Sequence, residues 1–365
     1  MKKKRIVFTV TNDINFDQRM LRICTSLHDA GYDVTIIGFK KKNSPPLPDR
    51  PYKQLRIPII VEKTKLMYAD YWIKLFFVLL FRKADAFCAI DLDTILPVYL
   101  VSVLRRKKRV YDAHELFTEL QEVVTRPFVL RMWTAIERFM VPRFKFGYTV
   151  GSYIAEHFQK KYGVNYGVVK NATVKVPFIL PEKKNRYILY QGAVNIGRCF
   201  EYLIPAMKQV DVPMIICGEG NFYAETKALV KEHGLDDKIQ FTGYLAPPIL
   251  KRYTEQAYIG ITLFEAKGKS NFYSLANRFF DYMHHGVPQL AMKYPEYERI
   301  NADYEVALLI EKPDPECIAA ALNKLLTDDA YYRKLQLNCM KAREKYCWQE
   351  EEKVLLQTYQ KLFED

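Results

Sequence analysis

Residues 5–39 read RIVFTVTNDINFDQRMLRICTSLHDAGYDVTIIGF, and this stretch decides the fold class. Residues 5–10 form a short run of β-branched and aromatic side chains, which is typical of a buried strand. Apolar residues then recur at helical spacing over residues 18–30, Gly31 ends that pattern, and residues 34–39 form a second strand-like run. A strand, a helix and a second strand within about forty residues predict a right-handed βαβ unit, and therefore a parallel sheet.

The same alternation continues along the chain in two series. In the first series, further strands are expected at residues 86–90, 109–111 and 147–150. In the second, helices are expected at residues 200–210 and 222–233, and strands at residues 187–190, 212–217, 239–242, 257–263, 289–291 and 306–310. The length of 365 residues agrees with two domains, at roughly 150 residues each.

We therefore predict an α/β fold of two doubly wound, Rossmann-like domains, residues 1–175 and residues 176–344. The linker is expected near residues 171–185, which contain two prolines and a lysine pair. Ligands of such sheets bind beyond the carboxyl ends of the strands, so two domains that face each other predict a cleft. Residues 329–365 have a helical pattern throughout, and we expect residues 345–365 to pack back on the first domain.

Composition excludes several classes of protein. Hydrophobic residues make up 49% of the chain and charged residues 27%, which indicates a globular protein and not a disordered one. The apolar run at residues 75–81 is far shorter than the ~20 residues of a membrane span. Residues 6–10 are too short for the apolar core of a signal peptide, so the chain is expected to begin at Met1 and remain in the cytoplasm. The seven scattered cysteines are interpreted as buried thiols in a reducing compartment, and no metal-ligand spacing is present.

The excess of positive over negative charge lies entirely in the first half of the chain. Residues 1–175 hold 31 Lys and Arg against 16 Asp and Glu, a net charge of +15, whereas the remainder holds 24 against 26, a net charge of −2. The clusters at residues 2–5, 40–42 and 105–109 could each be a solvated rim, but the total favours an anionic partner. We expect an acidic membrane or a phosphorylated substrate and no nucleic acid, because no nucleic-acid-binding motif accompanies the charge.

Residues 68–83, YADYWIKLFFVLLFRK, carry apolar side chains at helical spacing and end in Arg82 and Lys83. Two interpretations are open. The segment is either a helix buried under a sheet or an aromatic, basic-flanked surface that lies on lipid headgroups.

Two segments of the second domain point to phosphate binding. In residues 271–291, NFYSLANRFFDYMHHGVPQLA, Ser274 could N-cap a helix that carries Arg278 in its first turns and Asp281 one turn later. The helix dipole and the amides near Ser274 and Leu275 favour a diphosphate, while Asp281 could accept hydrogen bonds from a ribose or simply be solvated. In residues 190–199, YQGAVNIGRC, Gly192 allows close backbone approach.

Arg198 in the same segment is expected to open the next helix, where a cation opposes the helix dipole. It is therefore either a phosphate ligand or a surface arginine.

In the first domain, residues 109–119, RVYDAHELFTE, place acidic side chains and His114 at the carboxyl end of a strand. Asp91 ends another strand at the same edge, and Asp17 and Arg19, which could pair with each other, follow the first strand. His114 could act as an acid or base, or it could be a structural histidine held by a carboxylate.

Together these segments resemble a bacterial GT-B glycosyltransferase of glycosyltransferase family 4, the group 1 family. The motifs, in the order typical of the family, are DQR (17–19), YDAHELF (111–117), YQGAVN…GR (190–198), CGEG (217–220), FTGY (241–244) and SLANRFFDYMHHGVP (274–288). They cover nearly the whole chain, and the last motif is the most specific.

The resemblance implies a nucleotide-sugar donor on the C-terminal domain, an acceptor on the N-terminal domain, retention of the anomeric configuration, and no metal ion or other cofactor. His114 would be catalytic and approach the transferred sugar. The donor would be held by Gly192, Arg198, Gly243, Tyr244, Ser274, Leu275, Arg278 and Asp281. The acceptor side would carry Asp17, Arg19, Asp91, Asp112 and Glu115.

The chain also departs from the family pattern. Asp281 stands where a glutamate is usual, Tyr273 where many members have a second glutamate, Ala276 where a proline is common, and Ala193 where many carry arginine.

The expected function is hexosyl transfer from a UDP- or GDP-sugar to a glycan or lipid-linked acceptor in cell-surface polysaccharide synthesis. The expected location is peripheral, on the inner face of the cell membrane. A nucleotide-sugar 2-epimerase of the same fold, and a non-catalytic module that binds sugar nucleotides or membranes, are the alternatives.

Overall fold

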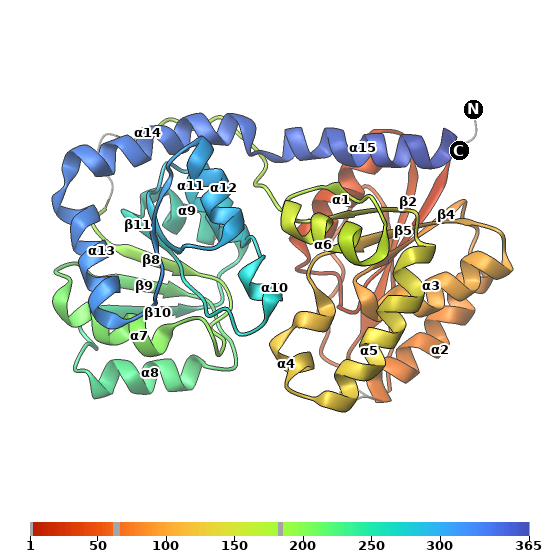
Figure 1. Cartoon of the computed structure of the whole chain (residues 1–365), viewed down its shortest axis with the longest axis horizontal. Coiled ribbons are helices and arrows are strands. Elements are labelled where there is room, and N and C mark those ends of the chain that lie inside the picture. The colour runs from red at the N-terminus through yellow and green to blue at the C-terminus, as the bar shows by residue number, and fades with distance from the viewer. Residues whose placement is uncertain (1–2, 61–65, 182–184, 365) are drawn as a thin grey trace. The chain divides into compact units, whose positions relative to one another are not determined.

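The computed structural model describes residues 3–60, 66–181 and 185–364. The chain divides into two compact units (Figure 1). Unit 1 comprises Met1–Lys170 and Glu351–Asp365, and unit 2 comprises Asn171–Glu350. Each described unit is built on a parallel sheet flanked by helices, which confirms the predicted fold class of two Rossmann-like domains.

Unit 1 contains a seven-stranded sheet in the order β3-β2-β1-β4-β5-β6-β7 within its described residues. Its strands are β1 (Arg5–Thr9), β2 (Asp33–Lys40), β3 (Lys53–Pro58), β4 (Ala86–Ile90), β5 (Lys108–Ala113), β6 (Phe146–Thr149) and β7 (Gly167–Val168). Its helices are α1 (Gln18–Asp29), α2 (Leu66–Phe81), α3 (Leu92–Leu104), α4 (Gln121–Val124), α5 (Pro127–Met140) and α6 (Ser152–Tyr162), with short 3-10 turns at Phe117–Glu119 and Val141–Arg143.

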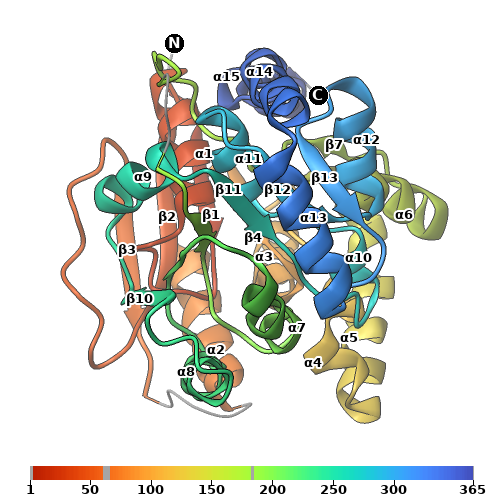
Figure 2. The same ribbon diagram turned by 90° about the vertical axis from the view of Figure 1, so that its left-hand side faces the viewer.

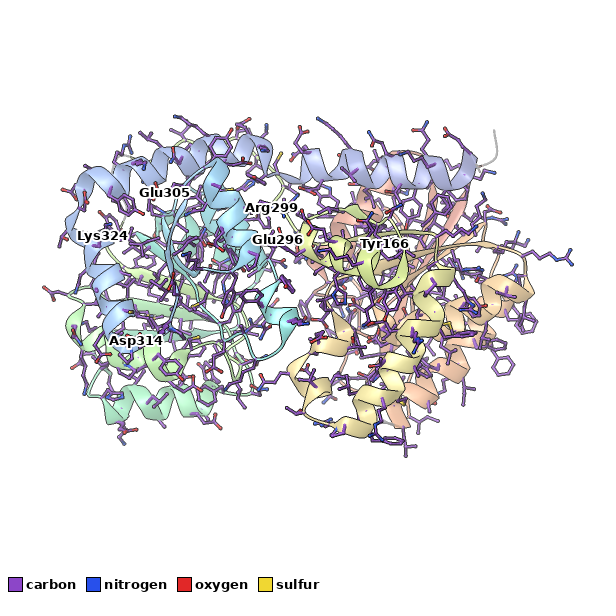
Figure 3. The ribbon with its side chains drawn as sticks, viewed as in Figure 1. Tyr166, Glu296, Arg299, Glu305, Asp314 and Lys324 are labelled. Atoms are coloured by element: carbon purple, nitrogen blue, oxygen red, sulfur yellow. The ribbon has the colours of Figure 1, made fainter. Side chains whose placement is uncertain are left out.

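The two faces of this sheet are covered by different helices. One face bears Phe8 and Tyr148, whose rings lie 6.0 and 6.3 Å from the ring of Tyr359 in α15 (Trp348–Glu364). The opposite face bears Phe87, which lies under the Arg105 guanidinium at the end of α3, and Tyr111, which packs against α6. Tyr166, just before β7, closes this second core by donating a hydrogen bond to the Phe144 carbonyl at 2.9 Å (Figure 3).

Within its described residues, unit 2 contains a six-stranded parallel sheet in the order β10-β9-β8-β11-β12-β13. Its strands are β8 (Ile188–Gln191), β9 (Met214–Cys217), β10 (Ile239–Gly243), β11 (Ile259–Thr262), β12 (Gln289–Met292) and β13 (Ala307–Ile310). Its helices are α7 (Phe200–Ala206), α8 (Tyr223–Glu232), α9 (Pro247–Gln256), α10 (Lys269–Phe272), α11 (Asn277–His284), α12 (Pro295–Asp303), α13 (Pro315–Thr327) and α14 (Asp329–Lys345), with a 3-10 turn at Met207–Gln209.

Helices α7, α8 and α13 pack together on one face of this sheet, and α9, α11 and α14 on the other (Figures 1 and 2). The helix ends are set by local polar contacts. Asp314 caps α13 by accepting the Cys317 N–H at 2.8 Å, and Glu305 accepts hydrogen bonds from Tyr331 and Lys334 of α14 (Figure 3).

Several predicted details differ from the structure. Strands β3 and β7 were not anticipated, because β3 is a half-exposed edge strand with polar residues and β7 is two residues long. The helix expected over 329–365 is interrupted at Tyr346 and Cys347, where α14 ends and α15 begins. Six of the seven cysteines are buried free thiols, as interpreted, but Cys317 is exposed. Lys2 of the first basic cluster lies outside the described residues.

None of the described helices is long and apolar enough to span a bilayer.

We predict that replacing Tyr359 with alanine lowers the unfolding free energy of unit 1 by about 3–5 kcal/mol, because its ring is fully buried between Phe8 and Tyr148. Tyr359→Phe is the matched control, since it removes only the hydroxyl, which lies 3.4 Å from that of Tyr148. Chemical denaturation followed by circular dichroism measures both. Equal stability of Tyr359→Ala and wild type would show that α15 contributes little to this core.

Candidate active site

A pair of arginines lies at the carboxyl end of strand β8. Arg278, in the first turn of α11, is 8% exposed and donates a hydrogen bond from Nη1 to the Gln191 carbonyl at 3.0 Å. Its guanidinium lies over the Tyr190 ring, 4.6 Å from the centroid, while its Nε is buried with no hydrogen-bond partner. Its charge is thus held by an aromatic face and a carbonyl, and no carboxylate of the described chain forms an ion pair with it.

Arg198 follows in the loop after β8, and its guanidinium lies over the Phe264 ring at the end of β11, 5.6 Å from the centroid. Burial, and then the neighbouring charge of Arg278, lower the pKa of Arg198, although an arginine remains charged at neutral pH. Within the described residues Arg198 also forms no ion pair. Two neighbouring positive charges without a carboxylate form a site that a bound anion would stabilise.

The loops around these arginines approach one another closely. Gly218 has φ of 148°, and a Cβ atom there would lie 1.9 Å from the Gly192 carbonyl oxygen. Gly192 has φ of 121°, and a Cβ atom there would lie 3.2 Å from Nη1 of Arg278. Cys199, which precedes α7, has φ of 61° despite its side chain, a strained conformation of the kind that concentrates at binding loops. This part of the chain sits where the strand order reverses between β8 and β11, the usual ligand position in such sheets.

Asp281 lies one turn further along α11, and both its carboxylate oxygens accept hydrogen bonds from the protein. Thr173 donates to Oδ1 at 2.6 Å and Gln191 donates to Oδ2 at 3.0 Å. The Gln191 side chain in turn accepts a hydrogen bond from Thr254 at 2.7 Å. Gln191 therefore links Asp281 to Arg278 and was missed by sequence reasoning, although a polar residue at the end of an apolar strand is the signal that marks it.

The prediction that Ser274 caps the helix is wrong. Helix α11 begins at Asn277 with Ala276 as its N-cap residue, and the Ser274 hydroxyl donates to the Asn271 carbonyl at 2.9 Å. The Ser274 N–H donates to that same carbonyl at 3.2 Å. Leu275 is buried, and the helix start is held by Tyr297, whose hydroxyl accepts the Ala276 N–H at 2.9 Å. A buried tyrosine from α12 thus replaces the side-chain cap, which local sequence cannot reveal.

Arg198 lies two residues before helix α7, which begins at Phe200 as the sequence predicted. Gly243 ends strand β10 with φ of 68°, and the Tyr244 N–H after it donates weakly to Glu219 at 3.4 Å. Tyr244 is 54% exposed, which leaves its ring accessible to a ligand.

In unit 1, Arg19 and Asp112 form a buried ion pair. Two guanidinium nitrogens of Arg19 donate to the two carboxylate oxygens of Asp112 at 2.8 and 3.2 Å, and a third donates to the Val169 carbonyl at 2.8 Å. The pairing of Asp17 with Arg19, left open by the sequence, does not form, because Asp17 instead caps α1 by accepting the Met20 N–H at 2.9 Å. Arg19 and Asp112 are 3% and 0% exposed, so they are too deeply buried to contact a ligand themselves and instead hold neighbouring side chains in place.

His114 stands between two carboxylates. Its Nε2 lies 3.0 Å from a carboxylate oxygen of Asp112, and its Nδ1 lies 3.4 Å from one of Asp91. The other carboxylate oxygen of Asp91 accepts a hydrogen bond from the backbone N–H of His114 at 2.8 Å. Burial alone would lower the pKa of His114, but the charges of Asp112 and Asp91 outweigh it and raise that pKa to about 9. His114 is therefore a cation at neutral pH with both ring nitrogens engaged, which favours a charge-bearing role over that of a base.

The remaining carboxyl groups of this cluster are difficult to ionise. Burial, and then the charge of Asp91, raise the pKa of Asp93 to about 7 and raise that of Glu115. Burial raises the pKa of Asp91 as well, and its backbone has a strained φ of 53°. Strands β1, β4 and β5 are neighbours in the sheet, and so their carboxyl ends bring these groups together. The described residues contain no group of His, Cys, Asp and Glu arranged to hold a metal ion.

Residues 175–345 match the family model described as glycosyl transferases group 1. This segment includes both arginines, Asp281 and the glycines of the loops described above. Unit 2 is a group 1 glycosyl transferase domain. The match confirms the predicted resemblance at the level of the group 1 glycosyl transferases, and it confirms the prediction that the protein is a glycosyltransferase. A search of curated protein sequences finds no significant match.

Solved structures with the same two-domain fold cover nearly the whole chain. Sucrose-phosphate synthase from Thermosynechococcus elongatus is 18% identical, with 99% of each chain covered and a TM-score of 0.80. The Anabaena protein HepE in complex with UDP-glucose is 13% identical, with 98% of this chain and 99% of that chain covered and a TM-score of 0.76. A UDP-N-acetylglucosamine 2-epimerase candidate from Listeria monocytogenes is 13% identical, with 100% and 97% covered and a TM-score of 0.69. At these identities the likeness establishes only that the chain has the same two-domain fold.

We predict that this glycosyltransferase loses stability as the pH rises from about 6.5 to 9. The folded-state pKa of His114, about 9, lies above its ordinary value near 6.5, so its stabilising charge is fully present below pH 6.5 and lost as the pH passes through 9. The raised pKa values of Asp93 and Glu115 act in the same direction. The loss should amount to roughly 2–3 kcal/mol, since one pKa unit corresponds to ~1.4 kcal/mol.

Thermal melts across this range measure the loss, and His114→Gln, which cannot titrate, should show a flatter profile. His233→Gln, which replaces a half-buried histidine of unit 2, is the control and should follow the wild type. A wild-type melting temperature that is constant or rises between pH 6.5 and 9 contradicts the assignment.

Proposed function

We propose that the protein transfers a hexosyl group from a UDP- or GDP-sugar to a glycan or lipid-linked acceptor, with retention of the anomeric configuration, in cell-surface polysaccharide synthesis. The observation that carries the proposal is the pair Arg198 and Arg278, two neighbouring guanidinium groups that form no ion pair with a described carboxylate, inside a group 1 glycosyl transferase domain. The structure of HepE with UDP-glucose supports a nucleotide-sugar donor for this fold.

The arginine pair matches the charge that develops in such a transfer. When the bond between the anomeric carbon and the diphosphate breaks, the bonding electrons stay with the phosphate oxygen, and the leaving group gains negative charge. Positive groups already in place at that oxygen stabilise the transition state more than the ground state. Arg198 and Arg278 would hold the diphosphate, so the proposal requires no metal ion. Asp281, held in place by Thr173 and Gln191, would accept a hydrogen bond from a ribose hydroxyl.

The carboxyl ends of β1, β4 and β5 in unit 1 would receive the acceptor. The new bond forms between an acceptor hydroxyl oxygen and the anomeric carbon, and the hydroxyl proton passes to the departing phosphate or to a carboxylate. The cluster of Asp91, Asp93 and Glu115 offers both ionised and protonated carboxyl groups for that hydroxyl. His114, held by Asp112 and Asp91, would lie beside the transferred sugar, and its charge would partly offset the negative charge of those two carboxylates. Retention itself is implied by the family resemblance.

The proposal is tested by incubating the protein with radiolabelled UDP- and GDP-sugars, with and without a lipid-linked acceptor. Transfer of the label to acceptor supports it. Epimerised donor without transfer would favour a 2-epimerase, and donor binding without either reaction would favour a non-catalytic module.

We predict that Arg198→Ala weakens the binding of a nucleoside diphosphate by about 1.5–3 kcal/mol, because charge-assisted hydrogen bonds to phosphate are lost. Isothermal titration measures this change, and Arg252→Ala, an exposed arginine of α9, should leave the affinity unchanged. If Arg198→Ala binds as tightly as wild type, the diphosphate does not lie at the end of β8.

We also predict that His114→Ala lowers kcat by ~10²–10⁴ while the affinity for the donor changes little, since His114 would act on the transferred sugar and not on the nucleoside diphosphate. Turnover is expressed per folded molecule, with His233→Ala as the control. Normal turnover of the folded His114→Ala fraction, together with a lowered melting temperature, would assign the histidine a purely structural role.

A further inference from the structure

Helix α2 is apolar on two sides. Tyr71, Leu75 and Leu79 face inward and are at most 1% exposed. Ile73, Phe77 and Phe81 follow one another four residues apart on the outer side and are 61%, 53% and 80% exposed. A helix on the surface of a globular domain is normally polar on its outer side, so an outward apolar stripe requires an explanation. The helix is therefore buried on one side, as one interpretation of residues 68–83 requires, and it exposes apolar side chains on the other side.

Helix α3 lies beside α2 and continues the apolar surface (Figure 1). Its outward side chains Leu100, Val103 and Leu104 are 42%, 48% and 65% exposed. Arg105, just after α3, donates a hydrogen bond to the Leu79 carbonyl of α2 at 2.9 Å, which fixes the carboxyl ends of the two helices together. We call these six outward residues, with the basic residues described below, the α2–α3 surface.

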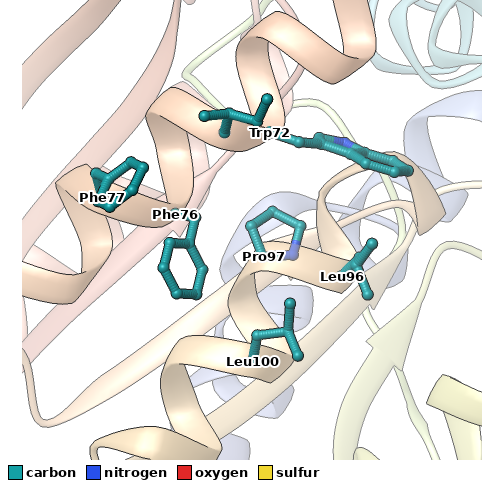
Figure 4. Close-up of a pocket in the computed structure, with 7 residues that line it drawn as sticks. Trp72, Phe76, Phe77, Leu96, Pro97 and Leu100 are labelled. Carbon is teal, nitrogen blue, oxygen red and sulfur yellow. The ribbon is translucent and has the colours of Figure 1, made fainter.

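An open apolar groove of about 280 Å³ runs between the two helices (Figure 4). It is lined by Trp72, Ile73, Phe76 and Phe77 of α2 and by Leu96, Pro97 and Leu100 of α3. The only side-chain nitrogen among these residues, Nε1 of Trp72, donates to the Asp93 carbonyl at 2.5 Å. The groove thus offers hydrocarbon contacts and no free polar group, as a lipid tail would require.

Basic residues border this apolar surface where the two helices end. Arg82 and Lys83 follow α2, and Arg106 and Lys107 follow Arg105 at the end of α3. No carboxylate of the described chain forms an ion pair with any of them. Arg82 and Lys83 also line a second hollow of about 410 Å³ beside Phe81. Unit 1 as a whole carries 32 Lys and Arg against 20 Asp and Glu, a formal net charge of +12.

We propose that the α2–α3 surface docks on a bilayer of anionic lipids, with the apolar stripe among the acyl chains and the basic residues among the headgroup phosphates. Charge complementarity favours this partner over a second copy of the chain. In a symmetric dimer the same basic residues of both copies would face each other and repel. The biological purpose of the docking rests on the proposed lipid-linked acceptor, but the physical argument does not.

The expected binding is reversible and salt-dependent. Each basic residue close to an anionic surface contributes about 1 kcal/mol, and this attraction weakens as salt shortens the range of electrostatic forces. The full chain should sediment with vesicles of phosphatidylcholine and phosphatidylglycerol at low salt, and it should remain in the supernatant with phosphatidylcholine alone. Bromine atoms on the acyl chains should quench the fluorescence of the bound protein, and less so in Trp72→Phe.

Two pairs of variants locate the contact. Arg82→Glu with Lys83→Glu should lower the partition coefficient at least tenfold, whereas Lys208→Glu with Lys231→Glu, exposed residues of unit 2, makes the same change in net charge and should have only a small effect. Phe77→Ser should weaken binding, and Ile249→Ser, which removes a similarly exposed apolar side chain from unit 2, should not. Thermal melts establish that each variant is folded.

Three outcomes would overturn the proposal. The wild type could stay in the supernatant at low salt, the two charge-reversal pairs could bind equally, or sedimentation velocity could show a dimer that Phe77→Ser dissociates. Titration of a nucleoside diphosphate without vesicles separates this proposal from the enzymatic one. Normal vesicle binding without nucleotide binding would contradict only the proposed function, and the converse would contradict only the docking.

Discussion

The ion pair between Arg19 and Asp112 is the constraint on which the N-terminal unit depends. Both side chains are almost completely buried, and removing either one would leave an uncompensated charge in the core at a cost of about 3–5 kcal/mol. The pair ties helix α1 to strand β5, and the third hydrogen bond of Arg19 reaches Val169 just beyond β7. One guanidinium group therefore connects the first helix of the unit to two strands on one side of its sheet.

The same ion pair organises the groups around it. Asp112 stays ionised because Arg19 and His114 outweigh the burial that would raise its pKa, and its second oxygen then holds His114. His114 in turn lies against Asp91, so positive and negative groups alternate outward from the core. Asp93 and Glu115 form no ion pair with Arg19 or His114, so burial and the charge of Asp91 raise their pKa values. The proposed acceptor side thus gains hydrogen-bonding groups without gaining four full negative charges.

Unit 2 uses arginine in the opposite way. Arg278 is buried as Arg19 is, yet its partners are the Tyr190 ring and the Gln191 carbonyl, which leave its charge uncompensated. Asp281, one turn away on the same helix, binds Thr173 and Gln191 instead. A buried cation kept apart from a nearby carboxylate is costly for folding, and an anionic ligand would recover that cost. This contrast between a paired and an unpaired arginine distinguishes a structural group from a binding group.

The sequence alone determined the two parallel sheets, because β-branched runs and helical periodicity are local properties that survive in any tertiary context. It also placed His114 at the end of a strand, Arg198 in the loop after another strand, and Arg278 and Asp281 together on one helix. It could not determine partners that come from distant parts of the chain. Arg19 pairs with Asp112 and not with Asp17, Tyr297 replaces Ser274 at the start of α11, and α2 is buried on one side and exposed on the other. Tertiary structure decided these details, because charge compensation and burial depend on which elements lie together in space.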